Sequence, residues 1–471
     1  MTGPRPDRLG ALDASFLRLE TRETPMHIGA VVILEGDPLR DADGRLRIED
    51  LRHLVESRLH LIPRFRKRVV EVPFDLGRPV WADDDRFDIA AHVRLTALPQ
   101  PGTWDQLVTL TERLQEHPLH RDRPLWELWF VDGLEDGRIA FIQKTHHALV
   151  DGVSGVDVAT VLLDITPEPA VFTPLPWTPD PAPSAATLVY EAVRAWIAEP
   201  AAIGAGLEHI LHAPLEAAHR ARRLIGAVQS LWSGRPLAPH TSVNVPVGRS
   251  RRFATVQIDL ASVKEVRAAL GGTVNDVVLA AVTGGFRSLF EGRGEIRDAE
   301  FTLRALCPVS VRSDDERGEL GNRVSGMIVP LPVGAPDAES RLRMIRAATY
   351  DAKERHQAVA ADFLVGLADY AAPTLLSLAA RFAHHQPLFN VVVTNVPGPQ
   401  VPLYCMGAEV VAGYPIVPLA RNLDVGVALL SYCGAISVGL FADRDAVADL
   451  DVLARGISEG VDALLRASRT A

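Results

Sequence analysis

The first 165 residues alternate between segments with strand character and segments with helical spacing. Residues 28–36 form a β-branched run that ends at glycine, and residues 138–147 form a second run of this kind, so both predict strands. Leucine and valine recur at helical spacing within residues 48–61, and again within 152–165, so both of these segments predict helices. The alternation predicts an α/β unit.

The character of the chain changes after this unit. Residues 166–183 contain repeated prolines, which exclude helix and central strand and therefore predict a linker or crossover. Alanine-rich helical sequence follows from about residue 186 to 231, and a second mixed segment begins near Phe253. We therefore predict an N-terminal domain over 1–165, a linker and helical crossover over 166–250, and a C-terminal domain over 251–471. A chain of 471 residues is also too long for one ordinary core.

Composition narrows the function classes. The formal net charge is −10 and no long basic patch is present, so nucleic acid is a poor candidate partner. Three widely spaced cysteines support neither a disulfide framework nor a cysteine zinc site, and they favour a reducing cytoplasm. The first ten residues lack the apolar core of a signal peptide, and no apolar run approaches the ~20 residues of a spanning helix. We expect a cytoplasmic protein that contacts membranes only peripherally, on the inner face.

The most informative motif is HHALVDG, which runs from His146 to Gly152 between a predicted strand and a predicted helix. Side chains alternate along a strand, so His146 and His147 should point in opposite directions. Transfer of an acyl group to an alcohol needs a base for the hydroxyl proton. An imidazole with a pKa of about 6.5 suits that role and can return the proton to the leaving thiolate.

The same motif leaves alternatives open. Asp151 could orient the imidazole, or it could brace the loop through an arginine, with Arg64, Arg66 and Arg312 as candidates. Adjacent histidines are also found as core or surface residues without a catalytic role. A metal site has less support, because no HExxH pattern or carboxylate triad accompanies the histidines.

Several segments together resemble the bacterial wax ester synthase/acyl-CoA:diacylglycerol acyltransferase family, within the chloramphenicol-acetyltransferase-like superfamily. The resemblance spans nearly the full chain. It rests on HHALVDG and on six further segments: LDASFLRLETRETPMHIG from Leu12, RPLWE from Arg123, TVNDVVLAA from Thr273, PVSVR from Pro308, GNRVS from Gly321 and VVTNVPGP from Val392.

The resemblance implies two chloramphenicol-acetyltransferase-like α/β domains with mixed sheets and an interdomain tunnel. It implies that His147 is the general base, that His146 supports it and that Asp151 holds the loop. The residues expected to contact substrate are Gly152, Asn275, Asp276, Pro124, Leu125, Trp126, Asn395, Pro397 and Gly398. No permanently bound cofactor and no metal are expected, and acyl-CoA enters as a co-substrate.

Each of these segments also has a structural interpretation. Thr273 and Asp276 match a helix capping box. The RPLW segment could simply turn the chain and bury the Trp126 indole. Residues 395–398 carry a strong turn signal. Glu20 is expected to be a surface carboxylate or a paired one.

The function predicted from the resemblance is transfer of an acyl group from acyl-CoA to diacylglycerol, giving triacylglycerol. Long-chain alcohols are alternative acceptors and would give wax esters. The competing interpretations are a condensation-type acyltransferase with another acceptor, and a non-catalytic lipid-binding protein. The helical stretch from Glu191 could lie on a membrane or lipid-droplet surface, or it could pack on its own protein.

Overall fold

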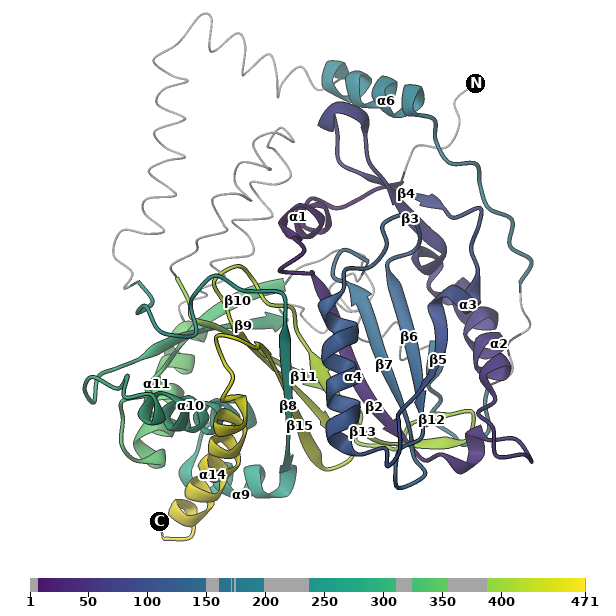
Figure 1. The fold of residues 1–471 in the computed structure, drawn as a ribbon. Coiled ribbons are helices and arrows are strands. Elements are labelled where there is room, and N and C mark those ends of the chain that lie inside the picture. Colours follow the sequence, from purple (N-terminus) through teal and green to yellow (C-terminus); the bar gives the residue numbers. More distant parts are fainter. Residues whose placement is uncertain are drawn as a thin grey trace, which may run out of the picture.

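The computed structural model describes residues 7–149, 161–170, 172, 175–198, 237–310, 324–354 and 388–470. Two six-stranded sheets and one three-stranded sheet organise this part of the chain (Figure 1). Both large sheets contain parallel and antiparallel pairs, as the predicted α/β class with mixed sheets requires.

The N-terminal sheet is built around the two strands predicted from the sequence. These are β2 (His27–Leu34) and β7 (Ile139–His146), which pair antiparallel with His27 opposite His146. The sheet order is β12-β13-β2-β7-β6-β5, where β5 is Val93–Ala97, β6 is Trp126–Asp132, β12 is Tyr404–Cys405 and β13 is Ala408–Ile416.

The two faces of this sheet are covered by different helices. Val32 and Leu34 belong to a core with α2 (Ile48–Arg58), whereas Val31 and Ile33 face α4 (Trp104–Glu116). The two-residue period of a strand accounts for this division. A 3-10 turn follows α2 within the predicted helical segment, α3 (Ile89–His92) lies before β5, and α1 (Ala11–Leu19) precedes β2. The small sheet has the order β1-β4-β3, with β1 at Asp7–Arg8, β3 at Lys67–Val70 and β4 at Val80–Asp83.

The C-terminal sheet carries its helices on one side (Figure 1). Its order is β10-β9-β11-β14-β15-β8, with β8 at Arg251–Asp259, β9 at Leu303–Ser310, β10 at Val324–Leu331, β11 at Val391–Pro397, β14 at Val425–Tyr432 and β15 at Ala435–Asp443. The helices are α9 (Leu260–Leu270), α10 (Val274–Gly292), α11 (Ala338–Glu354) and α14 (Leu450–Ser468). Helices α10 and α14 approach closely at Gly285 and Gly456, where an added Cβ on Gly456 would lie 2.9 Å from the Gly285 Cα.

One segment crosses between the two halves of the chain. By sequence, β12 and β13 fall inside the predicted C-terminal domain 251–471. The ladder places them in the N-terminal sheet instead, with Ile416 opposite Gly29. The predicted boundaries therefore do not describe sheet membership here, because backbone pairing ignores distance along the chain.

Helix α4 lies between the two large sheets (Figure 1). Strand β8 is an edge strand, whose outward amides need partners. Glu112 and Glu116, one turn apart on α4, supply them: the Phe253 N–H donates to Glu112 at 2.9 Å, and the Arg251 N–H donates to Glu116 at 2.9 Å. Residues of both halves share one apolar cluster, which includes Leu107 and Phe441.

The predicted linker and crossover, residues 166–250, are described only in part. The described residues of 166–183 form neither helix nor strand, and α6 (Ala185–Ala198) begins at the predicted alanine-rich segment. The rest of that segment, and the predicted helix 152–165 up to residue 160, lie outside the described residues. Within the described ranges no single helix meets the length and hydropathy test for crossing a membrane. Only α9 and α10 together meet it, across a 103° bend.

The predicted turn at residues 395–398 is wrong for its first three residues. Asn395, Val396 and Pro397 continue β11 and pair with β14 in parallel. Strand β9 pairs with β11 only at Val391 and Val392. The later residues of β11 therefore lie at a locally open edge, where a proline that cannot donate a hydrogen bond is tolerated.

Candidate active site

The histidine pair lies where β7 ends. His146 is the last residue of β7, and His147 begins the turn that follows. The two rings have different surroundings, as the strand geometry predicts. His146 is 1% exposed beside Glu20, whereas the half-buried His147 ring stacks on the Phe16 ring of α1 at 4.0 Å between centroids.

Three contacts fix His146. Its backbone N–H donates to the Leu125 carbonyl at 2.9 Å. Its Nδ1 accepts the Ala148 N–H at 3.0 Å, so Nδ1 carries no proton. Its Nε2 lies 3.4 Å from Oε1 of Glu20. The ring therefore closes the turn that carries His147.

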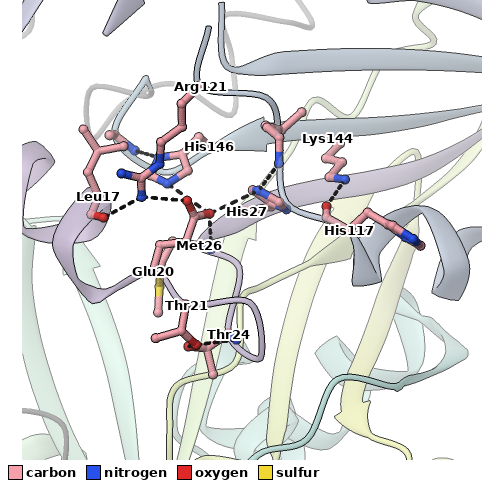
Figure 2. Close-up of polar contacts among 12 residues, drawn as sticks. Leu17, Glu20, Thr21, Thr24, Met26, His27, His117, Arg121, Lys144 and His146 are labelled. Carbon is pink, nitrogen blue, oxygen red and sulfur yellow. Dashed lines mark hydrogen bonds and ion pairs between the residues drawn. The ribbon is translucent and has the colours of Figure 1, made fainter. Parts of the chain in front are cut away.

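Glu20, directly after α1, is the centre of a buried polar cluster (Figure 2). Its Oε1 accepts the Met26 N–H at 3.2 Å and lies 3.4 Å from Nε2 of His27. Its Oε2 accepts from Nη2 of Arg121 at 2.9 Å, and the same nitrogen donates to the Leu17 carbonyl at 2.7 Å. The Glu20 side chain is only 6% exposed, so these contacts take the place of water.

Burial and these contacts determine the protonation states of Glu20, His27 and His147. Burial alone would raise the pKa of Glu20, but its contacts with His146 and His27 hold that pKa well below its usual range, so the carboxylate is ionised. Burial lowers the pKa of His27 to about 3 and that of His147 to about 4. Both rings are therefore neutral at neutral pH, and a neutral imidazole at position 147 can accept a proton.

The PLW segment is buried in the N-terminal half. Trp126 is 1% exposed, its indole N–H donates to the Phe65 carbonyl at 2.8 Å, and its ring stacks on His92. Leu125 is fully buried and Pro124 is buried as well. These side chains belong to the N-terminal core. The segment still serves the site, since the Leu125 carbonyl holds the backbone of His146.

The Asn-Asp motif combines two roles. Thr273 and Asp276 form the predicted capping box at the start of α10, and Asp276 also accepts from the Thr349 hydroxyl at 2.8 Å. Asn275 is not part of the cap. Its Oδ1 accepts from Nδ2 of Asn395 at 3.1 Å, so the structure brings two expected substrate-contacting residues together.

The remaining expected residues are placed as follows. Pro397 is exposed at the end of β11. Gly398 lies against β14, where an added Cβ would be 2.3 Å from the Ser431 carbonyl oxygen. Asp151, Gly152 and Arg312 lie outside the described residues. Of the other candidate partners of Asp151, Arg66 donates to the Glu56 carbonyl and lies over the Trp177 ring.

The sequence interpretation missed most of the cluster around the histidines. It expected Glu20 to be a surface or paired carboxylate, and the carboxylate is indeed paired with Arg121. It assigned no role to Phe16, His27 or Arg121. A signal for His27 was present, because antiparallel pairing of the two predicted strands places it near His146. Within the described ranges no group of three or more His, Cys, Asp and Glu residues could hold a metal ion.

Comparison with known sequences identifies similar proteins along the whole chain. The model of the wax ester synthase/diacylglycerol acyltransferase catalytic domain matches residues 9–278, and the model of the WS/DGAT C-terminal domain matches residues 320–464. A probable diacylglycerol O-acyltransferase, tgs1 of Mycobacterium tuberculosis (strain CDC 1551), is 34% identical over 467 residues. That match covers 98% of this chain and 96% of the relative.

Solved structures agree. The wax ester synthase/diacylglycerol acyltransferase from Marinobacter aquaeolei VT8 matches with a TM-score of 0.70 at 27% identity, covering 98% of this chain and 99% of that chain. The starter condensation domain of rhizomide synthetase in complex with C8-CoA matches with a TM-score of 0.57 at 12% identity, covering 98% and 95%. The second likeness concerns the fold alone. The expected two-domain acyltransferase fold is confirmed.

Proposed function

Because the chain belongs to the wax ester synthase/diacylglycerol acyltransferase family, we propose that it transfers a fatty acyl group from acyl-CoA to diacylglycerol, forming triacylglycerol. One observation supports this proposal most directly. A neutral, half-buried His147 stands on a turn that is fixed on both sides, by His146 and by the Met26 carbonyl, which accepts the His147 N–H at 2.8 Å.

The reaction follows from the properties of that imidazole. His147 takes the proton of the acceptor hydroxyl as the oxygen attacks the thioester carbonyl. The new C–O bond gives a tetrahedral oxyanion, and its collapse breaks the C–S bond. The CoA thiolate then takes the proton back from His147. This direct path forms no acyl-enzyme.

The proposal also covers the co-substrate, alternative acceptors, the role of Asn275 and contact with a lipid surface. Acyl-CoA serves as co-substrate and no permanent cofactor is needed. Long-chain alcohols are proposed as second acceptors, because a hydrophobic site distinguishes chains that differ by one methylene by only ~1–3 kcal/mol. Asn275 is proposed to contact the oxyanion or the substrate. Because diacylglycerol is insoluble in water, we propose peripheral contact with a membrane or lipid-droplet surface.

The test uses purified protein, palmitoyl-CoA, and diacylglycerol or hexadecanol as parallel acceptors. CoA release and neutral-lipid product are followed for wild type, His147→Ala and the control His240→Ala, which removes an exposed histidine. We expect ester from wild type and control, and loss of ester in His147→Ala. The ratio of products ranks the two acceptors.

Other outcomes identify the alternatives. Binding of lipid without ester, by folded wild-type protein, would favour a non-catalytic lipid-binding protein. Release of CoA only in the presence of a different acceptor, such as an amine, would favour condensation-type chemistry. Ester formation that persists in His147→Ala would overturn the assignment of the base.

A further inference from the structure

Glu20 contacts the histidine that shapes the catalytic turn, although it does not contact His147 itself. We infer that Glu20 is a positioning residue of the reaction, which acts through His146 by holding that ring in the tautomer that closes the turn. This inference rests on the proposed function, and it adds a residue from outside the HHALVDG motif to the catalytic machinery.

The contacts of His146 determine which ring nitrogen holds its proton. Its Nδ1 accepts the Ala148 N–H, so a neutral ring must have its proton on Nε2. The Nε2 atom lies 3.4 Å from Oε1 of Glu20 and makes no hydrogen bond within the described residues. The two groups therefore interact through charge: in a buried site the full charge of a carboxylate acts strongly on a nearby N–H. Glu20 thus favours the Nε2–H tautomer and leaves Nδ1 free for Ala148.

The carboxylate is itself held in place. The Met26 N–H donates to Oε1, and the Met26 carbonyl accepts the His147 N–H at 2.8 Å. Glu20 therefore reaches the backbone of His147 from the β2 side and its neighbour His146 from the β7 side. Helix α1, which ends at Leu19 just before Glu20, also supplies the Phe16 ring that stacks on His147.

Arg121 provides the compensating charge. It donates to Oε2 of Glu20 at 2.9 Å and to the Leu17 carbonyl at 2.7 Å. A buried carboxylate without such a partner would be strongly unfavourable. The pair leaves Oε1 to the Met26 amide and to His146, since Nε2 of the neutral His27 accepts the Leu119 N–H at 3.3 Å.

A glutamine cannot reproduce this arrangement. One end of its amide is a donor only, so it would meet either Arg121 or the His146 N–H with a second donor. Glu20→Gln keeps the size of the side chain and removes the fit. Loss of the tautomer would displace the turn, and misplacement of a catalytic group by about 1 Å can cost on the order of 10²-fold in rate.

The kinetic test combines Glu20→Gln with His146→Asn, which keeps an acceptor near the Nδ1 position and removes Nε2. We expect Glu20→Gln to lower kcat at least tenfold with little change in KM for palmitoyl-CoA. In the His146→Asn background the same change should cost less than threefold, because the two residues act as a pair. Glu23→Gln is the matched control, since the exposed Glu23 carboxylate pairs with Arg249 and should leave kcat unchanged.

A second measurement does not depend on activity. The ring nitrogens of ¹⁵N-labelled histidine are followed by NMR, with His146 assigned from the His146→Asn variant. Wild type should show the Nε2–H tautomer at His146, and Glu20→Gln should show a mixture. Full additivity of the two kcat effects, or an unchanged tautomer in Glu20→Gln, would overturn the inference. Absence of ester from wild type would count against the proposed function alone, since the tautomer is read independently.

Discussion

At the scale of single residues, the His147 imidazole lies in surroundings that disfavour its charged form. Burial lowers its pKa to about 4 from the ordinary 6.5. A general base must be unprotonated, so it stays active as the pH falls until that lower pKa is reached. We predict that the acidic limb of kcat/KM follows an apparent pKa near 4. Circular dichroism at each pH checks that the protein stays folded, and a limb near 6.5 would contradict the prediction.

Asp424 shows the opposite behaviour for a carboxyl group. It is fully buried in the C-terminal domain, and burial raises its pKa to about 7 from 3.8, with the neighbouring Asp443 adding to the effect. Below pH 3.8 the group is protonated in both folded and unfolded chains. As the pH rises toward 7, the unfolded chain ionises first, so the folded state loses stability relative to a chain without this carboxyl.

The variant Asp424→Asn tests this linkage. We expect its melting temperature, relative to wild type at the same pH, to improve steadily between pH 5 and pH 7 and to level off above pH 7, where both states are ionised. Comparison at equal pH cancels the other titrating groups, and Asp298→Asn, a change at another aspartate, serves as control. A difference that does not vary with pH would show that Asp424 titrates normally.

The candidate site was predictable where it depends on a local motif. His146 and His147 follow from the strand period, and Thr273 with Asp276 follows from the spacing of a capping box. The surroundings of Glu20 were not predictable in this way. The cluster forms only when α1, the start of β2 and the loop that carries Arg121 come together in the folded chain. Such a tertiary contact cannot be predicted from the periodicity of a single segment.

At the scale of elements, α10 begins with a reciprocal cap. The Thr273 hydroxyl accepts the Asp276 N–H at 3.2 Å, and the Asp276 carboxylate accepts the Thr273 N–H at 2.8 Å. Loss of such a cap costs about 1 kcal/mol. We predict that Thr273→Ala lowers the free energy of unfolding by roughly that amount, measured with denaturant, whereas Thr273→Ser keeps most of it. Equal stability of the two variants would exclude the cap as the cause.

Helices and strands were predicted best where a single hydrophobic period continues through the whole element. The strands β2 and β7 and the helix α2 match their predicted segments. The error at Asn395–Pro397 has a physical cause. Proline and glycine indicate a turn in an isolated sequence, but β11 has an open side that accepts them within a strand.

At the scale of the whole molecule, α4 joins the two halves through an ion pair and through hydrogen bonds with backbone groups. Glu112 accepts the Phe253 N–H with one oxygen and pairs with Arg444 at 2.7 Å through the other. At the end of α4, the buried Lys144 of β7 donates to the Leu114 and His117 carbonyls. The helix is thereby fastened to both large sheets.

We predict that Glu112→Ala loosens this junction. The Phe253 amide would lose its acceptor at the edge of the sheet, so its hydrogen exchange should accelerate and the melting temperature should fall. Glu112→Gln keeps an acceptor oxygen and should be milder, since it loses mainly the half-exposed partner Arg444. Slow exchange at Phe253 in Glu112→Ala would mean that other contacts hold the two halves together.

The crossing of β13 could not be predicted from the sequence. Its apolar pattern suits either sheet, and the choice depends on which edge is free when the halves meet. Two α/β halves were predictable from composition and spacing, whereas the exchange of a strand between them required the structure.

That exchange has a consequence for folding during translation. Synthesis proceeds from the N-terminus, so β2 emerges long before β13, the strand that covers its outer side. Until Ile416 has been made, β2 presents an unpaired apolar edge, which is a template for aggregation. The nascent N-terminal half therefore depends on late-arriving residues for its closure, and until they arrive the open edge of β2 can pair with strands of other chains.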